Sequence, residues 1–149
     1  MRMMRVAGAV LAVALAAAPA EGQEREVIRT TIIPAGLPFS SAVRVGDLVF
    51  LSGQIGNVPG TRQLADTGIA GQTRQTFENI KMVLAAAGTA LERVVKCTVF
   101  LVDMRDYAAM NVVYAEYFPK DPPARSTVAG TGLALGARVE IECVAMAGR

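Results

Sequence analysis

One arginine near the C-terminus has the chemical type and the setting to bind an anion. Arg125 follows two prolines in the segment PPARSTVAG and opens a run that predicts a β-strand. Its guanidinium is always charged, and its planar fork of donors matches the two oxygens of a carboxylate. Pro122 and Pro123 restrict the chain just before it, which favours a fixed contact. Arg125 therefore holds either a carboxylate ligand or a surface salt bridge, for instance to Glu140 or Glu142.

A glutamate on the last predicted strand is the second candidate. In ARVEIECVAMA the side chains alternate between two faces. One face is apolar, and the other mixes carboxylates with apolar residues: Glu140, Glu142, Val144 and Met146. Such a face is either a subunit interface with a polar pocket or a solvated sheet face. On it, Glu140 either positions and activates a water or forms a structural ion pair.

Two further polar segments are weaker candidates. In Ser52-Gly53-Gln54, the glycine at a strand end allows close approach of a ligand, although a bulge at a hairpin end explains it equally well. Asn111 lies in a predicted helix and either faces a ligand or satisfies a local backbone group.

The composition excludes several kinds of chemistry. The 149 residues contain no histidine, so a Ser-His-Asp triad, a Cys-His pair and a histidine metal site are ruled out. The two cysteines, Cys97 and Cys143, do not make a zinc site by themselves. Both lie in strongly apolar segments, so we expect buried thiols, with a disulfide as the alternative if the chain is exported.

The N-terminus resembles a secretory signal peptide. Residues 1–20 have a charged start with Arg2 and Arg5, an apolar run of about 15 residues and small residues at the end. We expect an exported, periplasmic protein; the alternative, a membrane anchor, needs roughly 20 apolar residues. Removing Arg2 and Arg5 reduces the Lys+Arg count from 15 to 13, which equals the 13 Asp+Glu. A chain of zero formal charge without a basic block does not predict nucleic-acid binding.

The remaining pattern predicts one domain, residues 28–149, after a linker at 21–27. Strands are expected at 27–33, 42–45, 48–53, 93–103, 124–130 and 137–147, with Gly46 in a hairpin turn. Apolar spacing predicts helices at 69–87 and 106–118, the first capped by Asp66 or Thr67 and ended at Gly88. The predicted fold class is α+β: two layers, with both helices on one face of a mixed sheet.

Together these segments resemble the RidA/YjgF family of reactive-intermediate deaminases, also called L-PSP endoribonucleases. The segments that carry the resemblance are AGLPFSSAVRVGDLVFLSGQIG, QTRQTFENIKMVLAAAG, VVKCTVFLVDM, NVVYAEYF, PPARSTV and ARVEIECVAM. They extend from about Ile28 to Ala147. The resemblance implies a chorismate-mutase-like fold and a homotrimer with a cleft between each pair of adjacent subunits. It also implies that Arg125 binds the substrate carboxylate and that Glu140 positions a water.

The implied reaction is hydrolysis of enamines and imines, such as 2-aminoacrylate and 2-iminobutanoate, to 2-oxo acids and ammonia without a cofactor. Ser52, Gln54 and Asn111 then line the cleft. Two positions depart from the family pattern: Phe39 stands where a tyrosine is common, and Thr127 where cysteine or serine is common. These departures leave an alternative open, an exported trimer that binds small carboxylates without catalysis or protects other proteins as a holdase.

Overall fold

The computed structural model describes residues 24–148, which form a sheet and two α-helices. The predicted signal peptide, residues 1–20, lies outside the described residues. The strands are β1 (Arg25–Ile28), β2 (Ala42–Val45), β3 (Leu48–Leu51), β4 (Gln54–Ile55), β5 (Val94–Leu101), β6 (Ala124–Ala129) and β7 (Val139–Met146). The α-helices are α1 (Ile69–Ala86) and α2 (Tyr107–Tyr117). Three short 3-10 turns lie at 91–93, 104–106 and 134–136.

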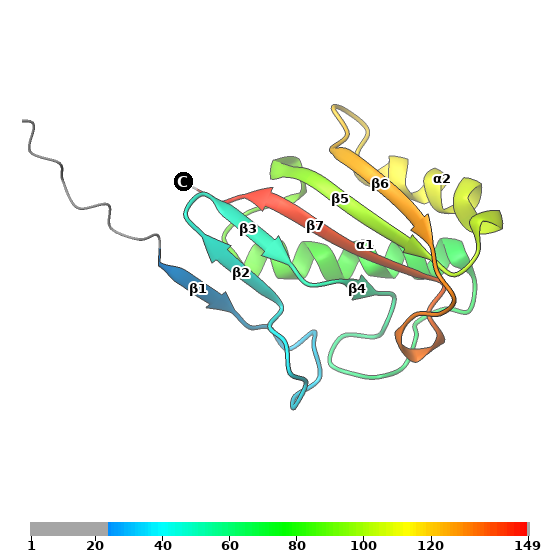
Figure 1. Cartoon of the computed structure of the whole chain (residues 1–149), viewed down its shortest axis with the longest axis horizontal. Helices are drawn as coiled ribbons and strands as arrows, with labels where there is room; N and C mark the ends of the chain where they lie inside the picture. Colours follow the sequence, from blue (N-terminus) through cyan, green and yellow to red (C-terminus); the bar gives the residue numbers. More distant parts are fainter. Residues whose placement is uncertain (1–23, 149) are drawn as a thin grey trace, which may run out of the picture.

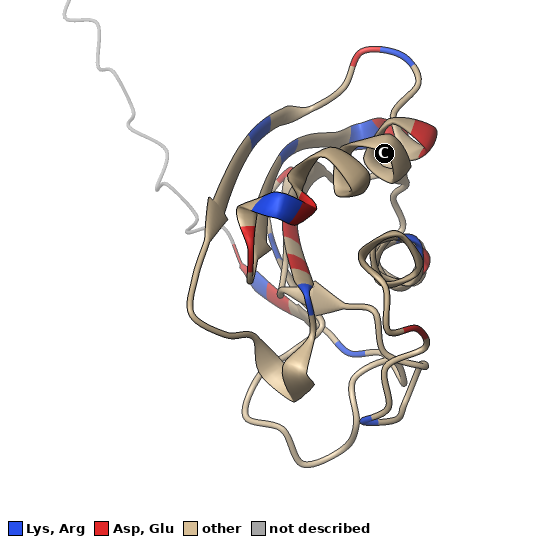
Figure 2. Cartoon of the chain, turned by 90° about the vertical axis from the view of Figure 1, so that its right-hand side faces the viewer, with Lys and Arg blue, Asp and Glu red and all other residues tan. Residues whose placement is uncertain are grey.

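The strands are ordered β1-β2-β3-β7-β5-β6, and β4 also pairs with β7 (Figure 1). All of these pairs are antiparallel except β5 with β6, which are parallel and are connected through α2. A parallel pair needs such a crossover connection. Both helices cover the same face of the curved sheet, as Figure 2 shows with α1 seen nearly end-on. The predicted two-layer α+β class is therefore confirmed.

The hydrophobic core lies between the sheet and the helices. On β7 the apolar alternation is as predicted: Val139, Ile141, Cys143 and Ala145 are buried. Phe77 of α1 is fully buried and contacts the rings of Tyr114 and Tyr117 of α2, with centroids 5.3 and 4.6 Å away. Burial of these aromatic side chains is a large part of what holds the two helices together.

Several element ends differ from the sequence predictions. The first strand is residues 25–28 rather than 27–33, because turns follow it, and it begins inside the predicted linker. Neither Asp66 nor Thr67 is the N-cap of α1; Gly68 is, and the Asp66 carboxylate accepts a hydrogen bond from the Gly68 N–H (2.7 Å). The predicted left-handed glycine after α1 is confirmed, since Gly88 has φ +70°.

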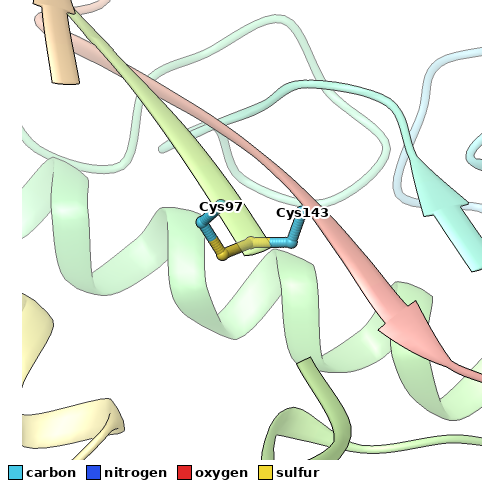
Figure 3. Close-up of a disulfide and its surroundings, with 2 residues drawn as sticks. All are labelled: Cys97 and Cys143. Carbon is cyan, nitrogen blue, oxygen red and sulfur yellow. A yellow bond between two sulfur atoms is a disulfide. The ribbon is translucent and has the colours of Figure 1, made fainter. Parts of the chain in front are cut away.

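The two cysteines are buried as predicted, but as a disulfide rather than as thiols. Cys97 on β5 and Cys143 on β7 are direct cross-strand partners, and their sulfur atoms are bonded (Figure 3). The expectation of free thiols was wrong because apolar flanks report only burial. Two buried cysteines that face each other across adjacent strands have the Cβ separation that a disulfide needs.

The face of the sheet opposite the helices carries large apolar side chains that are only partly covered. On it Leu48, Phe50, Val128 and Met146 are each about two-fifths to one-half exposed. No described helix is long and apolar enough to cross a membrane. An exposed apolar surface of this kind is typical of a protein–protein contact.

Candidate active site

Glu140 lies at the junction of two hollows beside the sheet. One is a cavity of about 390 Å³, and the other lies over the outer face of the sheet, next to Phe50 and Glu142. Both hollows are lined by Glu140, Gly53 and Phe39, and we call these three residues with their surroundings the glutamate pocket. The sequence prediction that Glu140 lies on the face opposite the helices is therefore correct.

The pKa of Glu140 is raised above the usual value of 4.5. Its half-buried position is the main cause, because burial disfavours the charged carboxylate, and the nearby Glu142 carboxylate adds repulsion. A carboxyl group with a raised pKa accepts and returns a proton more readily near neutral pH than an ordinary surface glutamate does.

Gly53 makes room for the Glu140 side chain. A Cβ at position 53 would lie 1.9 Å from Glu140 Oε1, closer than any real contact. The carboxylate therefore packs directly against the backbone of residue 53. The sequence suggested that this glycine admits a ligand or a bulge. In the structure it admits the protein's own carboxylate instead.

Two predicted ligand-binding residues fix the backbone of the glutamate pocket. The Ser52 hydroxyl donates to the Ser40 carbonyl (2.7 Å), which ties the segment before β2 to the end of β3. Gln54 is buried, and its Nε2 donates to the carbonyls of Ser52 and Gly53 (2.9 and 3.2 Å). These hydrogen bonds hold the segment that carries Phe39, which is half exposed at the pocket.

Arg125 lies on the other face of the sheet, against α2. Its Nη2 donates to the Tyr107 hydroxyl (3.2 Å), and its guanidinium lies 4.5 Å from the centre of the Tyr114 ring. None of the four ion pairs found among residues 24–148 involves Arg125. The alternative of a salt bridge to Glu140 or Glu142 therefore does not hold within one chain. The cation is positioned by aromatic rings, and its charge is left available for an anion.

Asn111 completes this group, which we call the arginine cluster: Arg125, Tyr107, Tyr114 and Asn111. Hydrogen bonding from Asn111 and from Arg125 lowers the pKa of Tyr107, while burial raises the pKa of Tyr114 to about 12. Asn111 Oδ1 and the Tyr114 hydroxyl are buried without a hydrogen-bond partner among the described residues. Buried polar atoms are usually hydrogen-bonded to protein groups or to ordered water, so these two atoms have capacity for a further hydrogen bond.

Thr127 lies two residues after Arg125 on β6 and is half-buried on the same face of the strand. The structure therefore divides the predicted site residues into two groups. Arg125, Asn111 and Thr127 lie at one edge of the sheet, on the helix side. Phe39, Ser52, Gln54 and Glu140 lie at the glutamate pocket.

The strand register explains this separation. Arg125 is level with Cys97 on β5, whereas Glu140 is level with Phe100, three residues further along that strand. Cys97 is buried on the helix face, and Glu140 lies on the opposite face. One small substrate does not reach both groups of a single chain.

Tyr107 and Tyr114 are site residues that sequence analysis missed. Both lie in the helix that apolar spacing predicts at 106–118, and that spacing counts their rings only as apolar positions of the helix. Two tyrosines seven residues apart occupy one face of a helix, and this face lies beside the strand that begins at Arg125. The sequence feature that could have identified them is the hydroxyl group of each tyrosine, because a helix face that only packs in the core has no use for a polar group there.

Within residues 24–148 there is no group of three or more His, Cys, Asp or Glu side chains that could hold a metal ion. The fold and these two groups define a class of protein: an α+β domain with a carboxylate at a surface hollow and, on the other face of the sheet, an arginine that packs against two tyrosine rings.

Comparison with known sequences places the chain within one family of this class. The family model described as "Endoribonuclease L-PSP" matches residues 29–147, and the chain belongs to this family. It is 41% identical over 127 residues to the chloroplastic Reactive Intermediate Deaminase A of Arabidopsis thaliana, covering 85% of this chain and 68% of that protein. It is also 41% identical to the mouse 2-iminobutanoate/2-iminopropanoate deaminase, over 83% of this chain and 93% of that protein.

Solved structures give the same result for the fold. RidA from the Antarctic bacterium Psychrobacter sp. matches with a TM-score of 0.76 at 40% identity, covering 81% of this chain and 98% of that one. Escherichia coli TdcF with bound serine matches with a TM-score of 0.76 at 33% identity, covering 83% and 99%. The resemblance inferred from sequence segments is thereby confirmed.

Proposed function

We propose that this protein hydrolyses 2-imino acids and their enamine tautomers to 2-oxo acids and ammonia. The observation that carries the proposal is a pair of groups: the Glu140 carboxylate, which lies in a hollow and has a raised pKa, and the Arg125 guanidinium, which has no acidic partner among residues 24–148. Relatives of known function that share about two-fifths of the sequence are named for this reaction.

The two groups act in one site when two copies of the chain meet. The Glu140 hollow opens on the outer face of the sheet, where apolar side chains are exposed around Phe50. A contact that joins this face of one copy to the β6 edge of the next would bury that surface and bring the arginine cluster of one copy to the glutamate pocket of the other. A heterologous contact of this kind closes into a ring of three when the rotation between adjacent copies is one third of a turn, and we propose such a homotrimer with three sites.

The chemistry needs only positioning and one oriented water. The enamine CH2=C(NH2)–COO⁻ tautomerises to the imine CH3–C(=NH)–COO⁻, whose carbon is electrophilic. Arg125 holds the carboxylate bidentately, and Glu140 accepts a proton from the water as its oxygen bonds to that carbon. That proton passes to nitrogen and gives the carbinolamine CH3–C(OH)(NH2)–COO⁻. The remaining hydroxyl proton then moves to nitrogen as the C–N bond breaks, and ammonia and a 2-oxo acid are released. That a solved relative binds serine, an amino acid, is consistent with a carboxylate subsite.

The test is a coupled assay in which an amino-acid oxidase or a lyase generates the imine. The protein is expected to speed 2-oxo acid formation, and Arg125→Ala to reduce kcat/KM by about 10- to 100-fold, since a charged hydrogen bond contributes ~1.5–3 kcal/mol. The proposal would be contradicted if the wild-type protein did not increase the rate of 2-oxo acid formation, or if Arg125→Ala had the same kcat/KM as the wild-type protein.

One further expectation from the sequence, export to the periplasm, belongs to the proposal. Export to the periplasm is supported by the predicted leader at residues 1–20 and by the Cys97–Cys143 disulfide, since disulfides persist in oxidising compartments. A periplasmic enzyme would meet imines formed outside the cytosol.

One observation favours a second candidate function, binding of small carboxylates without turnover. Phe39 lies at the glutamate pocket with no hydroxyl to donate. Calorimetry with 2-oxobutanoate, together with the coupled assay, separates the two functions, because a binder gives heat without turnover. A large gain of activity in Phe39→Tyr would show that only this hydroxyl is missing. RNA cleavage has no physical support here, because the chain lacks histidine and a basic block.

A further inference from the structure

The larger of the two hollows at Glu140 has more space than a three-carbon imino acid uses. Its volume is about 390 Å³. 2-Aminoacrylate has only six non-hydrogen atoms, and at on the order of 30 Å³ for each water-sized group it fills less than half of this space. The cavity instead has the size of sites that bind larger organic ligands.

The wall of this cavity is mostly apolar. Its side chains come from the loop before β2, from β4 and from the 3-10 turn before β7: Ile33, Pro34, Leu37, Phe39, Ile55 and Leu135. The only charged groups on it are Glu140 and Arg62. Glu140 lies where this cavity meets the second hollow, whereas Ile33, Leu37 and Leu135 line only the cavity.

The cavity is built into the fold rather than left by a loose loop. Asn79 of α1 is fully buried, and its Nδ2 donates to the carbonyls of Ile55 and Asn57 (3.0 and 2.9 Å). The Gly60 N–H donates to the Ile32 carbonyl (2.9 Å), which joins the loop after β4 to the loop before β2. These bonds hold opposite walls of the cavity at a fixed separation, so a ligand does not have to order them.

We propose that this cavity receives the substrate side chain, so that the preferred substrates are imines of large apolar amino acids such as leucine, methionine and phenylalanine. The inference rests on the proposed deaminase function and adds its substrate class. With the imine carbon at Glu140 and the carboxylate held by Arg125 of the adjacent copy, the third substituent of that carbon points into the cavity. Burying an apolar side chain there adds favourable free energy that a methyl group does not supply.

Arg62 suggests the competing class, an imine with an acidic side chain. It lies on an exposed loop and lines the cavity, and none of the ion pairs among residues 24–148 includes it. The cavity has six apolar side chains and one guanidinium on an exposed loop, so an apolar substrate side chain matches it better than an acidic one. The acidic class therefore enters the experiment as an outcome.

The experiment compares kcat/KM for imines that oxidases generate from alanine, leucine, phenylalanine and glutamate, measured as the loss of semicarbazide-trapped imine. The leucine and phenylalanine imines are expected to exceed the alanine imine by at least about tenfold, the discrimination that one or two methylenes give in an apolar pocket. Ala134→Phe adds a ring at the cavity wall and is expected to lower the ratio of the leucine and phenylalanine values to the alanine value by about tenfold.

Ala86→Phe, on the exposed end of α1 away from the cavity, is the matched control and is expected to change nothing. Fast hydrolysis of the alanine imine without a preference for large side chains would overturn this inference alone. A preference for the glutamate imine that disappears in Arg62→Ala would overturn it in favour of the acidic class. No acceleration with any imine would overturn the proposed function as well.

Discussion

Replacing Gly53 by alanine is expected to disable the Glu140 carboxylate while leaving the fold intact. The new Cβ would lie 1.9 Å from Glu140 Oε1 and 2.8 Å from its carboxyl carbon. No other neighbour lies closer to the new methyl group, so the carboxylate is the group that must move. It lies at the far end of a flexible side chain next to a hollow, and it can turn away at little cost in stability.

The size of the effect follows from that displacement. The contact has to lengthen from 1.9 Å to at least 3.0 Å, so Oε1 moves by about 1 Å or more. Misplacing a catalytic group by that distance can reduce a rate by about 100-fold, or ~2.7 kcal/mol of transition-state stabilisation. We therefore expect kcat to fall by about two orders of magnitude and the melting temperature to change by only a few degrees.

The assay is the coupled imine hydrolysis, and circular dichroism follows the fold. Gly130→Ala is the matched control, because a Cβ at that position meets no atom within 4 Å. The double variant Gly53→Ala with Glu140→Gln adds a further check: once the carboxylate is gone, the extra methyl group should have no additional effect on kcat. A Gly53→Ala protein with wild-type kcat would refute the placement of Glu140 as the proton-transferring group.

Three other perturbations give separate checks. Removing the disulfide with the double variant Cys97→Ala/Cys143→Ala opens a loop of 46 residues and should lower the unfolding free energy in urea by about 4 kcal/mol; an unchanged midpoint would argue against the bond. Glu142→Gln removes the negative charge that helps raise the Glu140 pKa, so the acidic limb of the kcat/KM–pH profile should move to lower pH, but only in part because burial remains; a shift to higher pH would contradict this cause. Tyr107→Phe removes the acceptor that orients the guanidinium and should raise KM about fivefold with kcat nearly constant, whereas a loss confined to kcat would assign the tyrosine a different role.

The sequence predicted the fold closely because its strong signals are local. The alternation of β7 gave both faces correctly, and Gly46 and Gly88 ended their elements with positive φ, as a turn and a helix end require. The errors fell where tertiary contacts decide. The first strand was placed too late, since its pairing with β2 at Arg25 has no signature in its own residues.

The sequence indicated candidate site residues one at a time but not how they are arranged. The types of Arg125 and Glu140 indicated an anion site and a water site, yet strand register alone places them on opposite faces of one chain. The disulfide was missed for a related reason. Cys97 and Cys143 are 46 residues apart in the sequence, and they face each other only because β5 pairs with β7. Tyr107 was missed because a tyrosine ring can pack in an apolar core just as well as it can pack against a cation.

The central claim is that each active site combines Arg125 of one copy with Glu140 of another, and mixing two impaired variants tests it most directly. Arg125→Ala and Glu140→Gln proteins are each expected to keep at most about a tenth of the wild-type kcat/KM as pure homomers. When they are unfolded together and refolded as mixed trimers, about one site in four receives both an intact arginine and an intact glutamate from different chains. The account therefore predicts recovery of roughly a quarter of wild-type activity, and mixed trimers that are no more active than the parents would contradict it.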